Sequence, residues 1–182
     1  FFDFIISLIF LFCFLPFFLI ISLLIIIFDG LPIFYISKRV GVYGNAFTMY
    51  KFRTMKNKIN NNQEDEPTKL GKYLRRSSID EIPQFFNILK NDMSIVGPRP
   101  LPINIEDKIP NELKQIRRLI KPGITGYSQI LFGKKKRYWD EKIQQDISYV
   151  KNKSFFKYIY IIILTFPTII KRFRFNNKGR TL

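Results

Sequence analysis

The feature that most constrains this chain is a long apolar run near its first residue, from Phe4 to Phe28. The run is 25 residues long, more than the roughly 20 that a helix needs to cross the hydrocarbon core of a bilayer. It is too long for the apolar part of a secretory signal peptide, and no small-residue cleavage site follows it. A helix that is apolar on every face also suits the core of a small soluble domain poorly. The sequence therefore predicts a membrane-inserted helix within residues 1–30.

This helix has two candidate topologies. Pro16 lies near its middle, where a proline removes one backbone hydrogen bond and kinks a helix. A kinked helix can still span a bilayer, whereas a broken one can enter and leave through the same face. Lys38 and Arg39 follow the run, but a charged flank on one side does not decide between the two. The residues alone leave both topologies open.

The rest of the chain is strongly basic. Residues 1–37 contain no lysine or arginine, so all 30 basic residues follow them, against 14 acidic residues in the whole chain. Such a domain favours polyanions, which include phospholipid headgroups, nucleic acid and phosphorylated small molecules. The chain has no histidine and one cysteine, Cys13, which excludes a Ser-His-Asp centre, a His-ligated zinc and an internal disulfide. A metal here would be a hard, oxygen-ligated ion such as Mg²⁺.

The patterns that follow the apolar run predict a mixed, helix-rich α/β domain over residues 31–182. The segment from Asp29 to Met55 is typical of turn, strand, turn and strand, with the strands at residues 34–36 and 47–52. The polar, asparagine-rich residues 57–69 indicate a mobile loop. Helices are expected over residues 70–89, 105–120 and 139–150.

A second apolar segment, from Tyr158 to Ile170, is 13 residues long and too short to span a bilayer. Lys157 precedes it, and basic residues follow at positions 171, 172 and 174. Aromatic residues with flanking cations favour an interfacial segment at the headgroup boundary, over about residues 155–175. The alternative is a buried hydrophobic helix or a pair of strands.

Asp80 and Glu81 stand side by side ahead of an apolar stretch. Ser78 and Glu81 match the S-x-x-E capping box, so the two acids could simply begin a helix. Pro83 argues against a helix that starts just after Ser78, because a proline has no backbone N–H and would fall in the second turn of that helix. Neighbouring side chains on a helix point about 100° apart, which suits one carboxylate for a substrate and the other for a cation. The spacing leaves the capping and the catalytic interpretations open.

Arg99 lies between Pro98 and Pro100. Flanking prolines restrict the backbone on both sides and favour an extended Arg99. A guanidinium on a stiff backbone loses less entropy when it binds a phosphate. The pattern predicts a phosphate-binding arginine, and the alternative is a plain turn that leaves a helix.

Segments along nearly the whole chain resemble, in order, the motifs of the bacterial sugar transferases, the monotopic phosphoglycosyl transferases of cell-surface glycan assembly. The central one is SIDEIPQFFNILKNDMSIVGPRP. The others are DGLPIFYISKRVG with FTMYKFRTM, LGKYLRRSSIDEIPQ, KPGITGYSQI and WDEKIQQDISYVKNKSF.

The resemblance implies a reaction: transfer of a sugar-1-phosphate from a UDP-sugar to a polyprenol phosphate (undecaprenyl phosphate), with release of UMP. This would be the first membrane step of a bacterial surface glycan or glycoprotein pathway. It implies that Asp80 forms a covalent phosphosugar intermediate and that Glu81, with Asp80 beside it, holds Mg²⁺. It also implies a re-entrant N-terminal helix broken at Leu15-Pro16, and a catalytic domain on the cytoplasmic face of the inner membrane, where nucleotide sugars occur.

The substrate-binding residues expected from the pattern and the resemblance are Arg99, Pro98, Pro100, Lys51, Arg53, Asp146 and Gln129. Lys51 and Arg53 alternate on the strand face of Met49, and their alternative role is a solvated or lipid-facing basic stripe. Asp146 aligns with a functionally important acid of the family, and its alternative role is a surface ion pair. The basic run at residues 134–137 suits either phosphate or headgroup binding or a solvated loop.

Two other functions compete with the transferase. A non-catalytic membrane-bound scaffold, or lipid-binding module of a glycan assembly complex, would tolerate changes at Asp80 and Glu81. Nucleic-acid binding has only the charge in its favour, since no nucleic-acid motif is present. The expected partners are therefore a UDP-sugar, a polyprenol phosphate and membrane phospholipid, without nucleic acid, and the sequence is compatible with a monomer or a homodimer.

Overall fold

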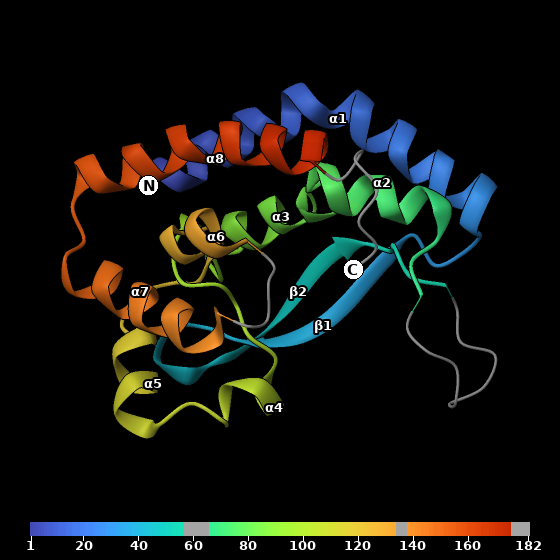
Figure 1. Cartoon of the computed structure of the whole chain (residues 1–182). Helices are drawn as coiled ribbons and strands as arrows, with labels where there is room; N and C mark the ends of the chain where they lie inside the picture. Colours follow the sequence, from blue (N-terminus) through green and yellow to red (C-terminus); the bar gives the residue numbers. More distant parts are fainter. Residues whose placement is uncertain (57–65, 134–137, 176–182) are drawn as a thin grey trace.

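The computed structural model describes residues 1–56, 66–133 and 138–175, with the side chains of 172–175 left aside. It is the mixed, helix-rich α/β fold that the sequence predicts (Figure 1). The helices are α1 (Phe2–Asp29), α2 (Lys69–Ser77), α3 (Gln84–Leu89), α4 (Ile103–Glu106), α5 (Asn111–Arg117), α6 (Tyr127–Phe132), α7 (Trp139–Lys151) and α8 (Phe155–Phe175). The strands are β1 (Phe34–Val40), β2 (Ala46–Phe52), β3 (Ser94–Val96) and β4 (Gly123–Thr125), and the 3₁₀ turns are η1 (Val42–Gly44) and η2 (Ile79–Glu81).

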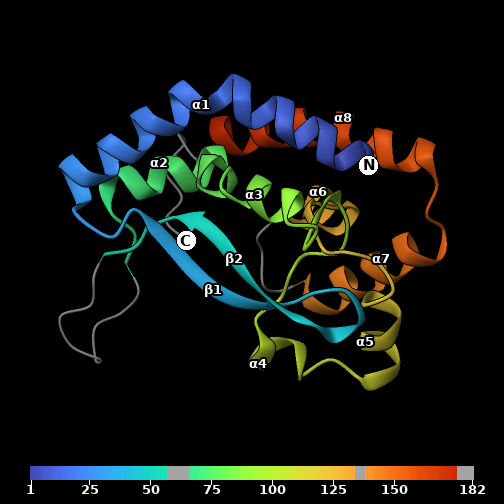
Figure 2. The same cartoon turned by 180° about the vertical axis from the view of Figure 1, so that it is seen from behind.

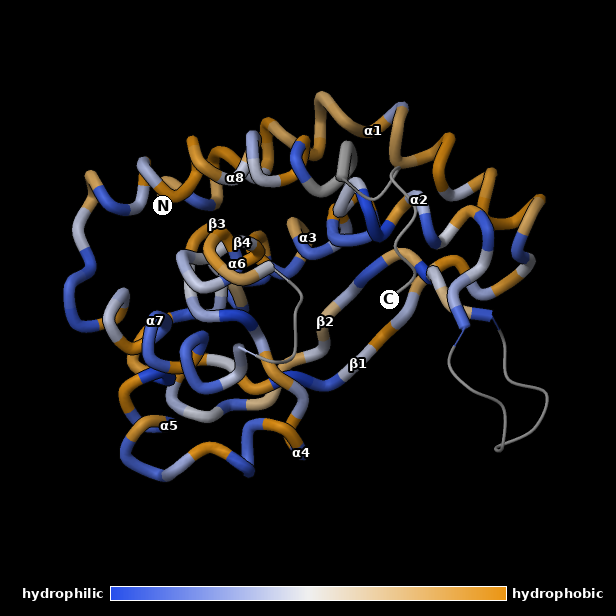
Figure 3. Tube along the Cα trace, in the orientation of Figure 1, coloured by the Kyte–Doolittle hydropathy of each residue, from blue (hydrophilic) through white to orange (hydrophobic). Residues whose placement is uncertain are grey.

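The elements are arranged in layers. Helices α1 and α8 form an outer layer, and α2, α3 and α6 lie beneath it, seen from both sides in Figures 1 and 2. The β1–β2 hairpin and helices α4, α5 and α7 lie farther from that layer. Figure 3 shows that α1 is hydrophobic along almost its whole length and that α8 carries both hydrophobic and polar residues. The fold therefore has an apolar side and a polar side, with α2, η2 and α3 between them.

Helix α1 confirms the prediction of a helix suited to a membrane. By length and composition it can cross one, and only 6% of its most apolar 18-residue stretch is buried. Pro16 lies inside the helix, and the ribbon bends along its length (Figure 1). Both ends contact the folded domain. The Asp3 carboxylate accepts hydrogen bonds from Ser94 Oγ at 2.6 Å and from the Tyr158 hydroxyl, and the Asp29 carboxylate accepts one from Thr68 Oγ1 at 2.7 Å.

The predicted strand pair is confirmed and is longer than expected. β1 and β2 are antiparallel, with Phe34 opposite Phe52 and Val40 opposite Ala46. The tight connection is made at Tyr43 and Gly44, both of which have positive φ. This hairpin extends from the outer helix layer toward the opposite side of the molecule (Figure 2). Its residues also line the cavity described below.

A second pairing, which sequence reasoning missed, joins segments far apart in the chain. The short strands β3 and β4 are parallel, and the Gly97 amide donates to Thr125 O at 3.0 Å. The Gly123 amide donates to Pro98 O at 2.9 Å. A Cβ atom at Gly123 would collide with the backbone of Gly97. Gly97 and Gly123 therefore allow the Gly-Pro-Arg-Pro loop, residues 97–100, to pack directly against strand β4.

The helical prediction for residues 70–89 is correct only in part. The segment is divided into α2, η2 and α3. The capping-box interpretation is wrong, since Ser78 has a φ of 59° and its side chain makes no capping hydrogen bond. Helix α3 starts after Pro83, because a proline can begin a helix but cannot donate within one. The acidic pair thus lies on a separate 3₁₀ turn between two helices.

Of the other two predicted helices, one is wrong and one is confirmed. The single helix expected over residues 105–120 is wrong, because α4 ends at Glu106 and α5 begins after Pro110, where proline again fixes the backbone and lacks a donor. Helix α7 confirms the one expected over residues 139–150. Residues 155–175 form α8, whose outer face exposes Phe156, Tyr160 and Ile163. Most of the loop predicted at 57–69 lies outside the described residues.

Gly71 provides a first test of this packing. It lies in the first turn of α2, and a Cβ atom there would collide with the backbone of Thr54 beyond the end of β2. Gly71→Ala is expected to lower the free energy of unfolding by about 1–3 kcal/mol, as overpacking does elsewhere. The measurement is the unfolding temperature in detergent, with the exposed neighbour Lys72→Ala as the matched control. Equal stability of the two variants would contradict the close contact.

Candidate active site

The acidic pair borders a large, basic cavity. The cavity has a volume of about 930 Å³ and lies between the β1–β2 hairpin, η2 and the loop that follows β3. Its aromatic wall includes Phe34, Tyr35 and Phe52. Its charged lining consists of Arg39, Lys51, Arg53, Lys56, Arg75, Arg99, Asp80 and Glu81. Six cations against two carboxylates, beside aromatic rings, suit an anionic ligand that carries phosphates and a planar group.

The local backbone holds Asp80 and Glu81 at the cavity. The turn η2 begins after the left-handed Ser78, and the Glu81 amide donates to Ser78 O at 3.1 Å. Asp80 is 5% exposed and Glu81 is 7% exposed. Buried carboxylates are costly unless they are paired or serve a function. The prediction that these acids do more than start a helix therefore agrees with their placement.

Glu81 bridges two cations from different parts of the chain. Lys51 Nζ on β2 donates to Glu81 Oε1 at 2.8 Å, and Arg99 Nη2 approaches the same oxygen at 3.3 Å. Burial lowers the pKa of Lys51, although the nearby Glu81 carboxylate opposes that shift. The expectation that Lys51 and Arg99 belong to one site is thus supported by their shared partner, and Lys51 is not part of a solvated stripe.

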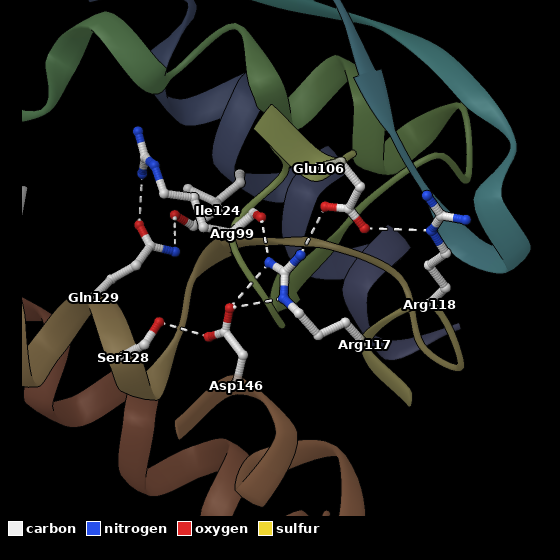
Figure 4. A network of polar contacts seen from close by, with 8 residues as sticks. All are labelled: Arg99, Glu106, Arg117, Arg118, Ile124, Ser128, Gln129 and Asp146. Atoms are coloured by element: carbon white, nitrogen blue, oxygen red, sulfur yellow. Dashed lines mark hydrogen bonds and ion pairs between the residues drawn. The ribbon is translucent and has the colours of Figure 1, made fainter. Parts of the chain in front are cut away.

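Gln129 holds the guanidinium of Arg99 (Figure 4). Arg99 Nη1 donates to Gln129 Oε1 at 2.7 Å, and Gln129 Nε2 donates to Ile124 O at 3.4 Å. Pro98 and Pro100 are buried on either side of Arg99 and restrict its backbone. The guanidinium is therefore aimed at Glu81 by a rigid loop and by the first turn of α6.

Arg53 plays a different part from the one suggested by strand alternation. It follows the last residue of β2, and its Nη2 donates to the carbonyl oxygens of Asp29 and Gly30, at 2.5 Å each. Its side chain also lines the basic cavity. Arg53 thus joins the end of α1 to the wall of the site.

Behind Arg99 lies a buried ionic network that sequence reasoning missed in part (Figure 4). Arg117 donates to the backbone oxygen of Arg99 at 2.9 Å, to Asp146 Oδ2 at 3.0 Å and to Glu106 Oε2 at 2.9 Å. Ser128 Oγ donates to Asp146 Oδ1 at 2.5 Å. Since both carboxylates and Arg117 are almost fully buried, the network is a rigid support for the loop of Arg99.

Asp146 belongs to this network and does not line the basic cavity. It is buried, so it is not the surface ion pair that was its alternative role. Burial raises the pKa of Asp146, and the Arg117 guanidinium opposes the shift.

The sequence signal for the partners of Asp146 in this network was weak. On a single helix, Glu106 and Arg117 would lie on one face together with Ile109 and Leu113. That spacing was misleading, because α4 and α5 are separate helices. The basic run at 134–137 lies outside the described residues.

Comparison with known proteins places this arrangement in a family. The profile of the family described as bacterial sugar transferase matches residues 1–172. The chain is 41% identical over 148 residues to the protein named uncharacterized sugar transferase EpsL of Bacillus subtilis (strain 168), covering 78% of this chain and 71% of EpsL. It is 39% identical over 160 residues to the galactosyl transferase CpsE of Streptococcus agalactiae serotype III (strain NEM316), covering 78% of this chain and 35% of CpsE.

A third relative has a name that describes its substrates. The UDP-N-acetylgalactosamine-undecaprenyl-phosphate N-acetylgalactosaminephosphotransferase of Aeromonas hydrophila is 35% identical over 156 residues. The match covers 78% of this chain and 36% of that protein, so the chain spans about a third of this relative and of CpsE. The profile match over nearly all of the chain, and the match to most of EpsL, confirm the resemblance found in the motifs. This chain belongs to the bacterial sugar transferase family.

Proposed function

We propose that this protein transfers a sugar-1-phosphate from a UDP-sugar to undecaprenyl phosphate and releases UMP. The observation that carries the proposal is the pair of buried carboxylates at the edge of a cavity lined by six cations, beneath an apolar helix layer. The cavity suits a nucleoside diphosphate sugar, and the apolar layer suits a lipid acceptor. The name of the Aeromonas relative describes the same pair of substrates for that protein.

Asp80 is the proposed nucleophile. One of its carboxylate oxygens forms a bond to the phosphorus that carries the sugar, while the bond from that phosphorus to the bridging diphosphate oxygen breaks and UMP leaves. An oxygen of the acceptor phosphate then attacks the same phosphorus, and the bond to Asp80 breaks. A carboxylate needs no general base for this attack, which suits a chain without histidine. Lys51 and Arg99 offset the negative charge that gathers when an anion attacks a diphosphate.

Mg²⁺ is the proposed cofactor, with Glu81 and Asp80 as its protein ligands. In the described part of the chain no group of three or more acidic, histidine or cysteine side chains could hold a metal. Two carboxylates at a cavity wall still fit Mg²⁺, because this ion is usually bound by one or two carboxylates together with substrate phosphates and water. When bound, it would neutralise phosphate oxygens during the displacement. Lys51 and Arg99 hold the Glu81 carboxylate in place beside the cavity.

The re-entrant topology is proposed for α1, with the catalytic domain on the cytoplasmic face of the inner membrane. Its support is that the two ends of α1 both contact this one domain: Asp3 bonds to Ser94, and Asp29 bonds to Thr68. A helix that crossed the bilayer would place its first turn on the other side of the membrane from the domain. The helix continues through Pro16 without the break expected at Leu15-Pro16, so a return through the same face would rest on a bend at this proline.

The test of the proposed function is a UMP-release assay. Purified protein in nanodiscs receives Mg²⁺, undecaprenyl phosphate and one UDP-sugar at a time from a panel. We expect UMP from a restricted set of donors, dependence on the lipid acceptor for continuous turnover, and loss of release with EDTA that added Mg²⁺ restores. A folded protein that neither releases UMP nor retains radiolabelled phosphosugar with any donor would favour the scaffold alternative.

Arg99→Lys tests the phosphate-binding role within the same assay. An ammonium group cannot approach Gln129 and Glu81 together as the planar guanidinium does, so we expect kcat/KM to fall about tenfold to a hundredfold, equivalent to roughly 1.4–2.8 kcal/mol. Arg76→Lys, on α2 and outside the lining of the cavity, is the matched control and should leave kcat/KM unchanged. Equal rates for the two variants would remove Arg99 from the site.

A further inference from the structure

A second, apolar cavity lies on the membrane-facing side of the acidic pair. Its volume is about 280 Å³, and it is lined by residues of α2, η2, α3, the β3–β4 pair, α6 and α8, with one contribution from α1. Its apolar lining consists of Phe10, Ile79, Ile82, Phe85, Ile95, Ile124, Ile130, Ile162, Phe166 and Ile169. A cavity with such walls favours a hydrocarbon chain over a nucleotide or a sugar.

The two cavities meet at one residue. Glu81 lines the apolar cavity as well as the basic one. Gln129 also lines the apolar cavity, and its side-chain oxygen accepts the hydrogen bond from Arg99, whose guanidinium lines the basic one. The apolar cavity therefore ends at the Glu81 carboxylate, which is paired with Lys51 and Arg99. A phosphate at this end would meet those two cations of the basic cavity.

Helix α8 forms the outer wall of the apolar cavity. Thr165 and Thr125 share a hydrogen bond of 2.8 Å between their hydroxyl groups, which attaches the middle of α8 to β4. The opposite side of α8 exposes Ile163 and Tyr160, and the helix lies with α1 in the outer layer (Figure 3). The wall is thus placed where a lipid that comes from the membrane would meet it.

Resting on the proposed function, we propose that this cavity binds the isoprenoid units next to the phosphate of the polyprenyl acceptor. The acceptor is an amphiphile with one hydrocarbon chain and one phosphate, which matches an apolar cavity that ends at Glu81, beside the cations Lys51 and Arg99 of the basic cavity. A diacyl phospholipid brings two chains to its headgroup and fits this shape less well. The charged donor occupies the basic cavity, the lipid chain occupies the apolar one, and their phosphates meet beside Asp80 and Glu81.

The first test fills the cavity from α8. Thr168 lines it, and its hydroxyl bonds only within the helix, to Leu164 O at 2.7 Å, among the contacts described for it. Thr168→Trp is expected to raise the KM for undecaprenyl phosphate about tenfold, since steric fit in an apolar pocket has effects of that order. The first release of UMP in the absence of acceptor should be unchanged, because the donor cavity is untouched. The matched control is Ile163→Trp, because Ile163 is 61% exposed on the outer face of α8.

These two readouts separate the possible failures. If wild-type protein releases no UMP, the proposed function fails. If UMP is released normally but Thr168→Trp leaves the acceptor KM equal to that of Ile163→Trp, the function stands and the acceptor cavity is wrong. A first UMP release that falls together with acceptor use would show general damage to the site and would also overturn the separate roles of the two cavities.

The second test measures binding without turnover and without a substitution in the cavity. A polyprenyl phosphate with a photoreactive group on its first isoprenoid unit is added to wild-type protein in nanodiscs without donor, and cross-linked peptides are identified by mass spectrometry. We expect cross-links in α3 and α8 that unlabelled polyprenyl phosphate displaces. Displacement by diacyl phosphatidic acid alone would assign the cavity to phospholipid, and cross-links confined to other helices would overturn the proposal.

Discussion

Asp80→Asn is expected to lower the rate of UMP release by roughly 10³-fold or more, because an amide lacks the anionic oxygen that forms the bond to phosphorus. The residue is buried at the edge of the cavity, on the 3₁₀ turn η2 between α2 and α3, so the near-isosteric amide should leave the fold intact. The loss should therefore appear in turnover and not in the unfolding temperature.

The measurement combines UMP release with capture of labelled phosphosugar on the protein. Wild-type protein incubated with a donor labelled in the sugar, without acceptor, should retain label covalently, and Asp80→Asn should retain none. Asp107→Asn, an exposed acid outside the site, is the matched control and should behave as wild type. Normal turnover in Asp80→Asn would exclude Asp80 as the nucleophile. If wild-type protein turned over without retaining label, direct attack by the acceptor on the donor would be favoured.

Arg117→Met is expected to cause the largest loss of stability, about 3–5 kcal/mol, because it leaves the buried carboxylates of Glu106 and Asp146 without their shared cation. The indole of Trp139, the one tryptophan of the chain, packs against the hydrophobic cluster that contains Leu101 and Ile147. Its fluorescence therefore provides a probe of unfolding close to the network. Arg99 should lose its backbone support at the same time, so kcat/KM should fall even where the variant remains folded.

The control is Arg118→Met. Arg118 contacts Glu106 at 3.3 Å and its side chain is 29% exposed, so its loss should cost less than about 1 kcal/mol. The destabilisation of Arg117→Met should also shrink in acid. Burial raises the pKa of Asp146 above 3.8 in the folded protein, so in acid the Asp146 carboxyl is protonated and no longer needs the Arg117 cation. This protonation stabilises the folded state at low pH, and the contribution is lost as the pH rises through the folded-state pKa. Equal unfolding temperatures for the two variants, at neutral pH, would refute the network as a support.

Local sequence patterns determined the elements and the chemistry of single residues. The apolar run predicted α1, aromatic and β-branched residues predicted the β1–β2 hairpin, and the periodicity of residues 139–150 predicted α7. The paired prolines predicted a stiff Arg99, and the family motifs identified Asp80 and Glu81. These features depend on neighbours in the chain, through hydrophobicity, proline geometry and hydrogen-bond supply, which is why a single sequence contains them.

Contacts between distant segments were decided only by the tertiary structure. The sequence did not indicate that Lys51 and Arg99 would share Glu81, or that Arg117 would support the loop of Arg99 from behind. It also gave no sign of the apolar cavity between α3 and α8. A buried ion pair needs two charges that become close only when the chain is packed, and a cavity depends on the space that side chains leave between elements. Several residues of the candidate site could therefore be named from the sequence, whereas the two cavities and their shared residue Glu81 arise from the way the helices pack.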